Sequence, residues 1–233
     1  MTSRPVGRPS AVLTDIEGTT TPIAFVHRTL FPFARERLGA FLDEHGAEPA
    51  VAAIVEDVRA QAPGQLPLEA LLAWMDQDAK VTPLKALQGL IWREGYASGD
   101  LHAEVYPDVP PRLRAWHAAG VRLAIYSSGS VEAQKQLFAH TEAGDLTPLF
   151  GAYFDTGVGA KRAAASYAAI AGAMALPPAE ILFLSDVEAE LDAARESGLA
   201  TCQLVRAEDG TVASDRHPTA ADFGAVAAAF GLA

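Results

Sequence analysis

Five short runs of apolar residues, rich in β-branched and aromatic side chains, stand out from the more polar remainder of the chain. They lie at residues 11–16, 121–128, 152–156, 181–186 and 200–205. Because each run is continuous and does not alternate with polar positions, it is typical of a parallel strand buried on both faces of a sheet. Amphipathic segments that indicate helices lie between the later runs, at 130–139, 163–175 and 189–197. This alternation predicts an α/β fold with a doubly wound parallel sheet.

Residues 22–108 break this rhythm, because they contain helical patterns and no convincing strand. Proline-containing turns separate the patterns, which cover 25–44, 51–61, 66–77 and 83–96. A stretch of this length is sufficient for a small domain. We therefore expect an α/β core of residues 1–21 and 109–233, split after its first strand by a helical insertion at 22–108. The alanine-rich segment 220–230 is expected to be a helix of that core.

The composition is that of a globular protein, with 50% hydrophobic and 20% charged residues among 233. No apolar run approaches the ~20 residues that span a bilayer, so no membrane-spanning segment is predicted. The first ten residues carry two arginines but no apolar core, which predicts a loose tail and no export signal. These features together predict a cytoplasmic protein.

Cys202 is the only cysteine, which excludes an internal disulfide and fits a reducing compartment. A lone cysteine can be a catalytic thiol, but this one lies in the apolar run LATCQLV, which favours a buried strand position. The net charge of −11 argues against nucleic acid and anionic membranes as partners. An anionic substrate would require local positive charge in its site, and a metal ion would supply it.

Polar side chains follow several of the predicted strands at the point where each strand ends. Asp15 and Glu17 follow the first strand, the sequence SSGS begins at Ser127 after the second, and Asp186 follows the strand at 181–184. Lys161 is expected at the start of a helix. Because ligands of open α/β sheets bind at the carboxyl ends of the strands, we expect these groups to converge on one crevice.

Considered alone, each of these residues has an ordinary structural explanation. A carboxylate that ends a strand is usually a turn or capping residue, and SSGS is usually a turn. Asp186 can cap the helix that begins near Val187. Glu188 and Glu190 are expected on the solvent-exposed face of that helix, and Lys161 alone would be a surface residue. The joint occurrence of these groups, in this order, indicates a shared site.

Phosphoryl transfer explains this combination of groups. A carboxylate such as Asp15 can attack phosphorus and form an acyl phosphate, which divides one difficult displacement into two easier ones. The attacking anion and the phosphate repel each other, and Mg²⁺ held by Asp15 and Asp186 would bridge them. Glu17 is placed to protonate the leaving oxygen and then to activate water.

The remaining polar groups would hold the phosphate itself. Ser127 or Ser128, together with nearby backbone N–H groups, can bind the phosphoryl oxygens. Lys161 would neutralise the charge that the phosphate and the nucleophile share. The pattern therefore predicts a magnesium-dependent phosphatase.

These segments resemble the four motifs of the haloacid dehalogenase-like phosphatases, in chain order. The similarity is closer to the enolase-phosphatase (acireductone synthase) family of methionine salvage. It rests on five strings, which begin at Asp15, Leu87, Ile125, Phe154 and Phe183: DIEGTTTPIAFVHRTLFPF, LQGLIWREGY, IYSSGSVEAQKQLF, FDTGVGAKRAAASY and FLSDVEAELDAARESGL. Together they cover the chain from about residue 12 to residue 205 and include the insertion, which corresponds to the helical cap of the family.

The resemblance implies a role for each matching residue. Asp15 would be the nucleophile and a magnesium ligand, and Asp186 would be the remaining carboxylate ligand. Glu17 would be the acid/base, with its backbone carbonyl on the metal. Lys161 would bind phosphate, and the other phosphate-binding residues would be Ser127, Ser128 and Gly129.

The resemblance also implies a substrate and a cellular setting. The family acts on 2,3-diketo-5-methylthiopentyl-1-phosphate, which it enolises and then dephosphorylates to an acireductone. Its members bind one Mg²⁺ per chain and are cytoplasmic monomers. Glu17 departs from the wider superfamily, where aspartate is usual, and this departure is characteristic of the enolase-phosphatase branch.

Three alternative functions remain open at the level of sequence. The chain could be a general sugar-phosphate phosphatase of the same fold, although the cap strings argue against it. It could be a dehalogenase, in which the aspartate attacks carbon and no metal is used. It could also be an inactive binding module, although the joint presence of Asp15, Glu17, Lys161 and Asp186 argues against that.

Overall fold

The computed structural model describes residues 8–232 and divides them into two compact units. One unit contains the residues up to Ile23 together with those from Ala103 onward, and Ala24–His102 form the other. Residues 1–7 of the predicted N-terminal tail lie outside the described part. The assignment of residues 22–108 to a cap domain stays a prediction.

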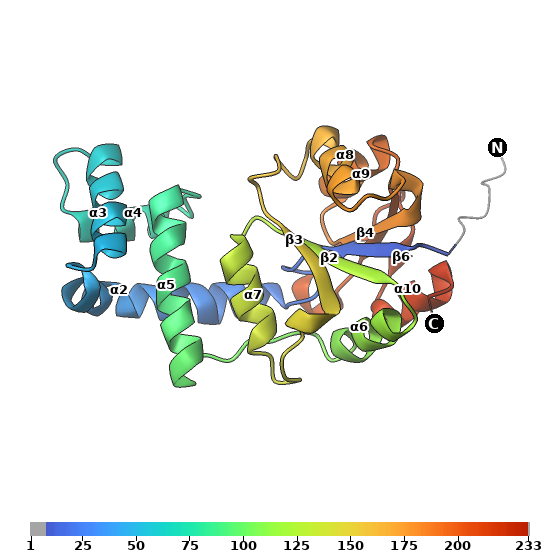
Figure 1. Ribbon diagram of the computed structural model, residues 1–233, viewed down its shortest axis with the longest axis horizontal. Coiled ribbons are helices and arrows are strands. Elements are labelled where there is room, and N and C mark those ends of the chain that lie inside the picture. Colours follow the sequence, from blue (N-terminus) through green and yellow to red (C-terminus); the bar gives the residue numbers. More distant parts are fainter. Residues whose placement is uncertain (1–7, 233) are drawn as a thin grey trace. The chain divides into compact units, whose positions relative to one another are not determined.

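A six-stranded parallel sheet forms the centre of the first unit, in the order β3-β2-β1-β4-β5-β6 (Figure 1). The strands are β1 (Ala11–Thr14), β2 (Arg122–Tyr126), β3 (Phe150–Phe154), β4 (Ile181–Ser185), β5 (Ala200–Leu204) and β6 (Thr219–Ala220). The predicted α/β class and parallel sheet are confirmed. β6 was not predicted, because two residues are too short to produce a hydrophobic pattern.

Helices cover both faces of this sheet. In Figure 1, α8 (Ala164–Ala173) and α9 (Glu188–Glu196) lie over one face, and α6 (Val109–Ala118) and α10 (Phe223–Phe230) lie over the other. α7 (Val131–Ala139) packs against β3. The sequence pattern missed α6, whose charged residues and two prolines obscure its buried positions. Proline is tolerated there because the first-turn amide has no helical partner.

The core of the sheet unit is strongly apolar. On one face, Leu13 and Phe183 pack in a cluster with Tyr167 and Leu191 from the covering helices. On the other, Trp116 stacks on Phe223 with ring centroids 5.2 Å apart. Cys202 is buried in β5, as its apolar neighbours predicted, and is not a surface thiol.

The second unit is helical, as the sequence predicted. It contains α2 (Phe31–His45), α3 (Pro49–Gln61), α4 (Pro67–Asp76) and α5 (Thr82–Ser98). A short α1 (Ile23–Phe25) leads into a π-helical turn, η1 (Val26–Leu30), which the sequence pattern did not distinguish from an ordinary helix. Trp92 donates its indole N–H to the carbonyl of Leu30 at the end of that turn. Among the residues described, no helix is long and apolar enough to cross a membrane.

The central position of β1 leads to a prediction about stability. Leu13 is fully buried in β1, so Leu13→Ala is expected to lower the free energy of unfolding by about 3 kcal/mol through lost burial and a residual cavity. Urea unfolding followed by far-ultraviolet circular dichroism measures this change. Leu66, which is 65% exposed, provides the control, and Leu66→Ala should cost less than about 0.5 kcal/mol. Equal effects of the two substitutions would contradict the assignment of β1 to the core.

Candidate active site

The carboxyl ends of β1 and β4 bring two of the predicted residues to one edge of the sheet. β1 pairs with β4 so that Thr14 lies beside Leu184. Asp15 follows β1 directly, and its backbone N–H donates to the carbonyl of Leu184 over 2.9 Å. Asp186 follows β4 directly. The two carboxylates therefore leave neighbouring strands at nearly the same level.

Lys161 meets Asp15 at this edge. Its ammonium lies 2.7 Å from Asp15 Oδ1, and both side chains are at most one-tenth exposed. The sequence pattern placed Lys161 at a helix start, whereas it lies in a turn that precedes the first residue of α8, Ala164. The structure thus confirms that Lys161 and Asp15 lie together. It places Lys161 in a turn, whereas the sequence placed it at the start of a helix.

The turn that carries Lys161 is tied down by side-chain hydroxyls. Three successive carbonyls, those of residues 159, 160 and 161, each accept a hydrogen bond, from Tyr126, Ser166 and Tyr167 in that order, at 2.7–2.9 Å. Gly159 has a φ of +139°, and a Cβ there would lie 2.3 Å from Ser166 Oγ. Only glycine fits this position, so the lysine backbone is closely held.

Glu190 is a further member of the site, and the prediction that it lies on the solvent-exposed face of α9 is wrong. Its Oε2 lies 2.7 Å from Lys161 Nζ and accepts a hydrogen bond from Ser185 Oγ over 3.0 Å. Its position in the helix explains this burial, because it shares a face with the buried Ala194 four residues later. Glu188, by contrast, is part-exposed and pairs with Arg216.

Lys161 therefore lies between two carboxylates. Burial lowers the pKa of an ammonium, but the charges of Asp15 and Glu190 outweigh it, so the pKa of Lys161 is raised above its usual value. Burial, followed by the negative charge of Asp15, raises the pKa of the Glu190 carboxyl. The lysine consequently stays charged and can neutralise an anion at this point.

Asp186 has the properties expected of a metal ligand. Its Oδ1 is buried and has no hydrogen-bond partner among the described residues. Burial, followed by the charge of Asp15, raises the pKa of Asp186 to about 7. The side chain does not cap α9, whose N-cap is Val187. A divalent cation near Asp186 and Asp15 would satisfy the unpartnered oxygen and offset the repulsion between the two carboxylates.

The turn that follows β1, the strand beside β4, leaves room for the Asp186 carboxylate. Gly18 has a φ of +70°, and a Cβ on it would lie 2.5 Å from Asp186 Oδ2. The hydroxyl of the buried Thr19 accepts the backbone N–H of Asp186 over 3.0 Å. Glu17 is half-buried in the same turn, where its backbone forms an isolated β-bridge with Thr21. Residues 15–21 thus wrap around the end of β4.

The donor set fits magnesium better than a softer metal. Within residues 8–232, no group of three or more His, Cys, Asp or Glu side chains is arranged to hold a metal ion. Mg²⁺ needs no such cluster, because it usually takes one or two carboxylates and retains several waters. Asp15 and Asp186 meet that requirement.

The serine loop follows β2, the other neighbour of β1. Ser127 is bonded to the carbonyl of Phe154 through its N–H, and its hydroxyl accepts the N–H of Gly129 over 3.3 Å. Ser130 caps α7 by accepting the N–H of Ala133. Gln134 is buried and donates to the carbonyls of both Gly129 and Phe154. Hydrogen bonds from Gln134 and to Phe154 therefore hold the loop in place, while Ser128 is exposed.

Comparison with known proteins agrees with this geometry. The haloacid dehalogenase-like hydrolase family matches residues 9–198. Enolase-phosphatase E1 of Granulibacter bethesdensis is 60% identical over 225 residues, which cover 96% of this chain and 97% of that protein. The protein of the same name from Acidiphilium cryptum is 60% identical and covers 96% of each chain. This chain belongs to the enolase-phosphatase family of haloacid dehalogenase-like hydrolases.

Solved structures share this fold. The UTR4 protein of Saccharomyces cerevisiae is 32% identical, with a TM-score of 0.79, over 92% of this chain and 98% of that one. CbbY of Rhodobacter sphaeroides, at 17% identity and a TM-score of 0.62, shares the fold alone. The resemblance to the enolase-phosphatases is thus confirmed by the curated relatives, and the solved structures agree with the fold.

In this member of the enolase-phosphatase family, Glu190 leads to a prediction about pH dependence. Glu190→Gln removes a negative charge beside Lys161 but keeps an amide oxygen as acceptor. Because that charge raises the pKa of Lys161, its removal lowers this pKa, and the alkaline limb of the kcat/KM profile should move to lower pH. We also expect kcat/KM at neutral pH to fall about tenfold.

The matched control lies two residues away on the same helix. Glu188→Gln removes a carboxylate that pairs with Arg216 at the surface, and it should change kcat/KM less than about twofold. An unchanged alkaline limb in Glu190→Gln would show that Glu190 does not set the charge of Lys161.

Proposed function

We propose that this enzyme converts 2,3-diketo-5-methylthiopentyl-1-phosphate to an acireductone and inorganic phosphate, as an enolase-phosphatase of methionine salvage. The names of its relatives, at 60% identity over nearly the whole chain, support this substrate class. The observation that carries the chemistry is the buried Asp15 carboxylate at the end of β1, 2.7 Å from the ammonium of Lys161. A carboxylate held beside a fixed cation can attack a phosphate without facing the full repulsion of its charge.

Enolisation first moves a proton from carbon 1 of the substrate to the oxygen on carbon 2, and we assign the first step of phosphoryl transfer from this enol form to Asp15 and Glu17. A lone pair of the Asp15 carboxylate forms a bond to phosphorus as the bond from phosphorus to the substrate oxygen breaks. Glu17, in its acid form, gives a proton to that departing oxygen. The products of this step are the dephosphorylated enediol and phosphate bound covalently to Asp15.

The second step regenerates the enzyme. Glu17, now a carboxylate, takes a proton from a water molecule, and the water oxygen attacks phosphorus. The bond between Asp15 and phosphorus breaks, which releases inorganic phosphate and restores the Asp15 carboxylate. Because Glu17 gains the proton that it lost in the first step, the proton balance closes over one turnover.

The remaining side chains bind and neutralise the phosphate. Lys161 would contact a phosphoryl oxygen while it stays paired with Asp15. The hydroxyls of Ser127 and Ser128 and the N–H of Gly129 would hold the other oxygens. The hydrogen bond between Ser127 and Gly129 supports this role, because both groups can exchange that contact for one to phosphate.

We propose that one Mg²⁺ per chain is held by Asp15, Asp186 and the backbone carbonyl of Glu17. When bound, the ion would supply positive charge that offsets the repulsion between the nucleophile and the phosphate. The unpartnered oxygen of Asp186 supports this assignment and does not favour a metal-free dehalogenase. Hard oxygen ligands also suit Mg²⁺ better than zinc or copper.

The cellular setting is part of the same proposal. We infer that the enzyme is a cytoplasmic monomer whose partner is the phosphorylated diketone, and that it binds neither nucleic acid nor membrane. The net charge of −11 supports the absence of polyanionic partners. Residues 22–108 would serve as a cap that excludes water from the reaction.

Replacing the nucleophile tests this function directly. Asp15→Asn removes the attacking charge while it keeps the size of the side chain, so phosphate release from the diketo phosphate should fall on the order of 10⁴-fold. Phosphate is measured together with the ultraviolet absorbance of the conjugated enediol. Asp76→Asn, in an exposed ion pair with Arg35, is the control and should retain full activity. Undiminished release by Asp15→Asn would overturn the mechanism.

Removing the metal tests a separate part of the proposal. Wild-type enzyme treated with a chelator should release phosphate at less than about one-hundredth of its original rate, and added Mg²⁺ should restore the rate. Phosphate release without the enediol absorbance would leave the phosphatase in place and exclude the enolase activity. Full activity in the chelator would exclude the metal.

A further inference from the structure

Arg206 is a buried arginine that the proposed chemistry does not use. It follows β5 and is 4% exposed. Its guanidinium forms a bidentate pair with Asp108, at 2.8 and 3.1 Å, and lies 3.9 Å from the ring centroid of Tyr106. This planar stacking and the two parallel hydrogen bonds hold the guanidinium in one orientation.

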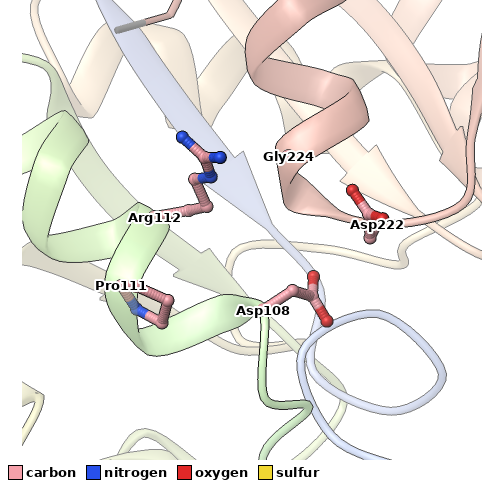
Figure 2. Close-up of a pocket in the computed structure, with 5 residues that line it drawn as sticks. All are labelled: Asp108, Pro111, Arg112, Asp222 and Gly224. Atoms are coloured by element: carbon pink, nitrogen blue, oxygen red, sulfur yellow. The ribbon is translucent and has the colours of Figure 1, made fainter.

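The pair with Asp108 is anchored at the start of two helices. Asp108 precedes α6 and also accepts the backbone N–H of Phe223, the first residue of α10, over 2.8 Å. Figure 2 shows Asp108 beside Asp222 and Arg112 at the edge of an open surface cavity. Both carboxylates already have partners, since Asp222 caps α10. The cavity is therefore better explained as the solvent-facing side of the Arg206–Asp108 ion pair than as a ligand site.

Arg206 also donates to two backbone carbonyls, that of Ala221 over 3.4 Å and one that connects it to the active site. One guanidinium nitrogen donates to the backbone carbonyl of Thr19 over 2.9 Å, in the turn that follows Asp15. The hydroxyl of the same threonine accepts the backbone N–H of Asp186. A continuous chain of direct hydrogen bonds thus runs from Arg206 through Thr19 to Asp186.

An ion pair that served only the fold would not need the contact with Thr19. Buried pairs are often replaceable by well-packed apolar residues, so burial of charge alone is a weak reason for an arginine. A carbonyl at the tight turn of residues 15–21, however, requires a donor when water is excluded. Arg206 supplies that donor and at the same time determines where the turn lies relative to the end of β4.

The geometry points to Arg206 as a positioning residue for the metal-binding end of the sheet. By holding Thr19, it positions the backbone of Asp186, one of the two carboxylates proposed above to hold the cation. The effect is indirect, because Arg206 contacts neither carboxylate. This inference rests on the metal site proposed above, and its first readout is independent of that site.

The test compares Arg206→Lys with wild type in the full chain. Lysine keeps the positive charge against Asp108, but one ammonium cannot form the bidentate pair and also reach Thr19 in a fixed plane. In metal-free protein, the amide proton of Asp186 should exchange with solvent at least about tenfold faster, as measured by nuclear magnetic resonance. Calorimetry should show Mg²⁺ binding about tenfold weaker, with KM at saturating Mg²⁺ changed less than about twofold.

Two further variants make the test specific. Thr19→Val keeps the shape of the side chain and the carbonyl that Arg206 contacts, but it removes the acceptor for Asp186, so it should weaken Mg²⁺ binding in the same way. Arg112→Lys alters an exposed arginine of the same surface and should leave exchange and binding unchanged. If Arg206→Lys fails to fold, Mg²⁺ binding by Thr19→Val alone tests the inference.

The outcomes separate this inference from the proposed function. A lower Tm of Arg206→Lys with unchanged Asp186 exchange and Mg²⁺ binding would overturn it and leave a structural ion pair. Unchanged Mg²⁺ binding in Thr19→Val would overturn it as well. Wild type that binds no Mg²⁺ would remove the metal site, and the exchange rate of the Asp186 amide would then decide whether Arg206 positions that residue.

Discussion

The crowding of negative charge at one edge of the sheet is the constraint on which the rest of the structure depends. Asp15, Asp186 and Glu190 are drawn together at the ends of β1 and β4, and Lys161 is the cation between two of them. Glu17 adds a further carboxylate in the same turn. One ammonium cannot balance this many anions in a poorly solvated place, so the site is built to accept additional positive charge. A divalent ion would supply that charge.

The parallel sheet makes this crowding possible, because it presents successive loops at the same edge. β1 lies between β2 and β4, so the nucleophile turn has the serine loop on one side and Asp186 on the other. The supporting contacts come from outside these strands. Hydroxyls hold the Lys161 turn, Gln134 holds the serine loop, and Arg206 holds the turn after Asp15. Each reactive group therefore stands on backbone that is already ordered before substrate arrives.

The sequence predicted the parts of the molecule that depend on local pattern. Continuous apolar runs identified the five longer strands, and the carboxyl ends of those strands identified Asp15 and Asp186. Glu190 was missed because its charge suggested a solvated face, although its spacing from Ala194 placed it on the buried one. Arg206 was missed for a related reason. Its partners, Asp108 and Thr19, are 98 and 187 residues away in sequence, and no periodicity reports such contacts.

The burial of Cys202 has a practical consequence for labelling the protein at a chosen position. Burial raises the pKa of this thiol to about 12, so it is almost entirely protonated at neutral pH and hidden from reagents. Because the chain has no other cysteine, a cysteine introduced at an exposed position such as Leu66 would be its only reactive thiol. A fluorophore or spin label could then be attached to the helical unit alone, without first removing a native cysteine, in otherwise unaltered enzyme.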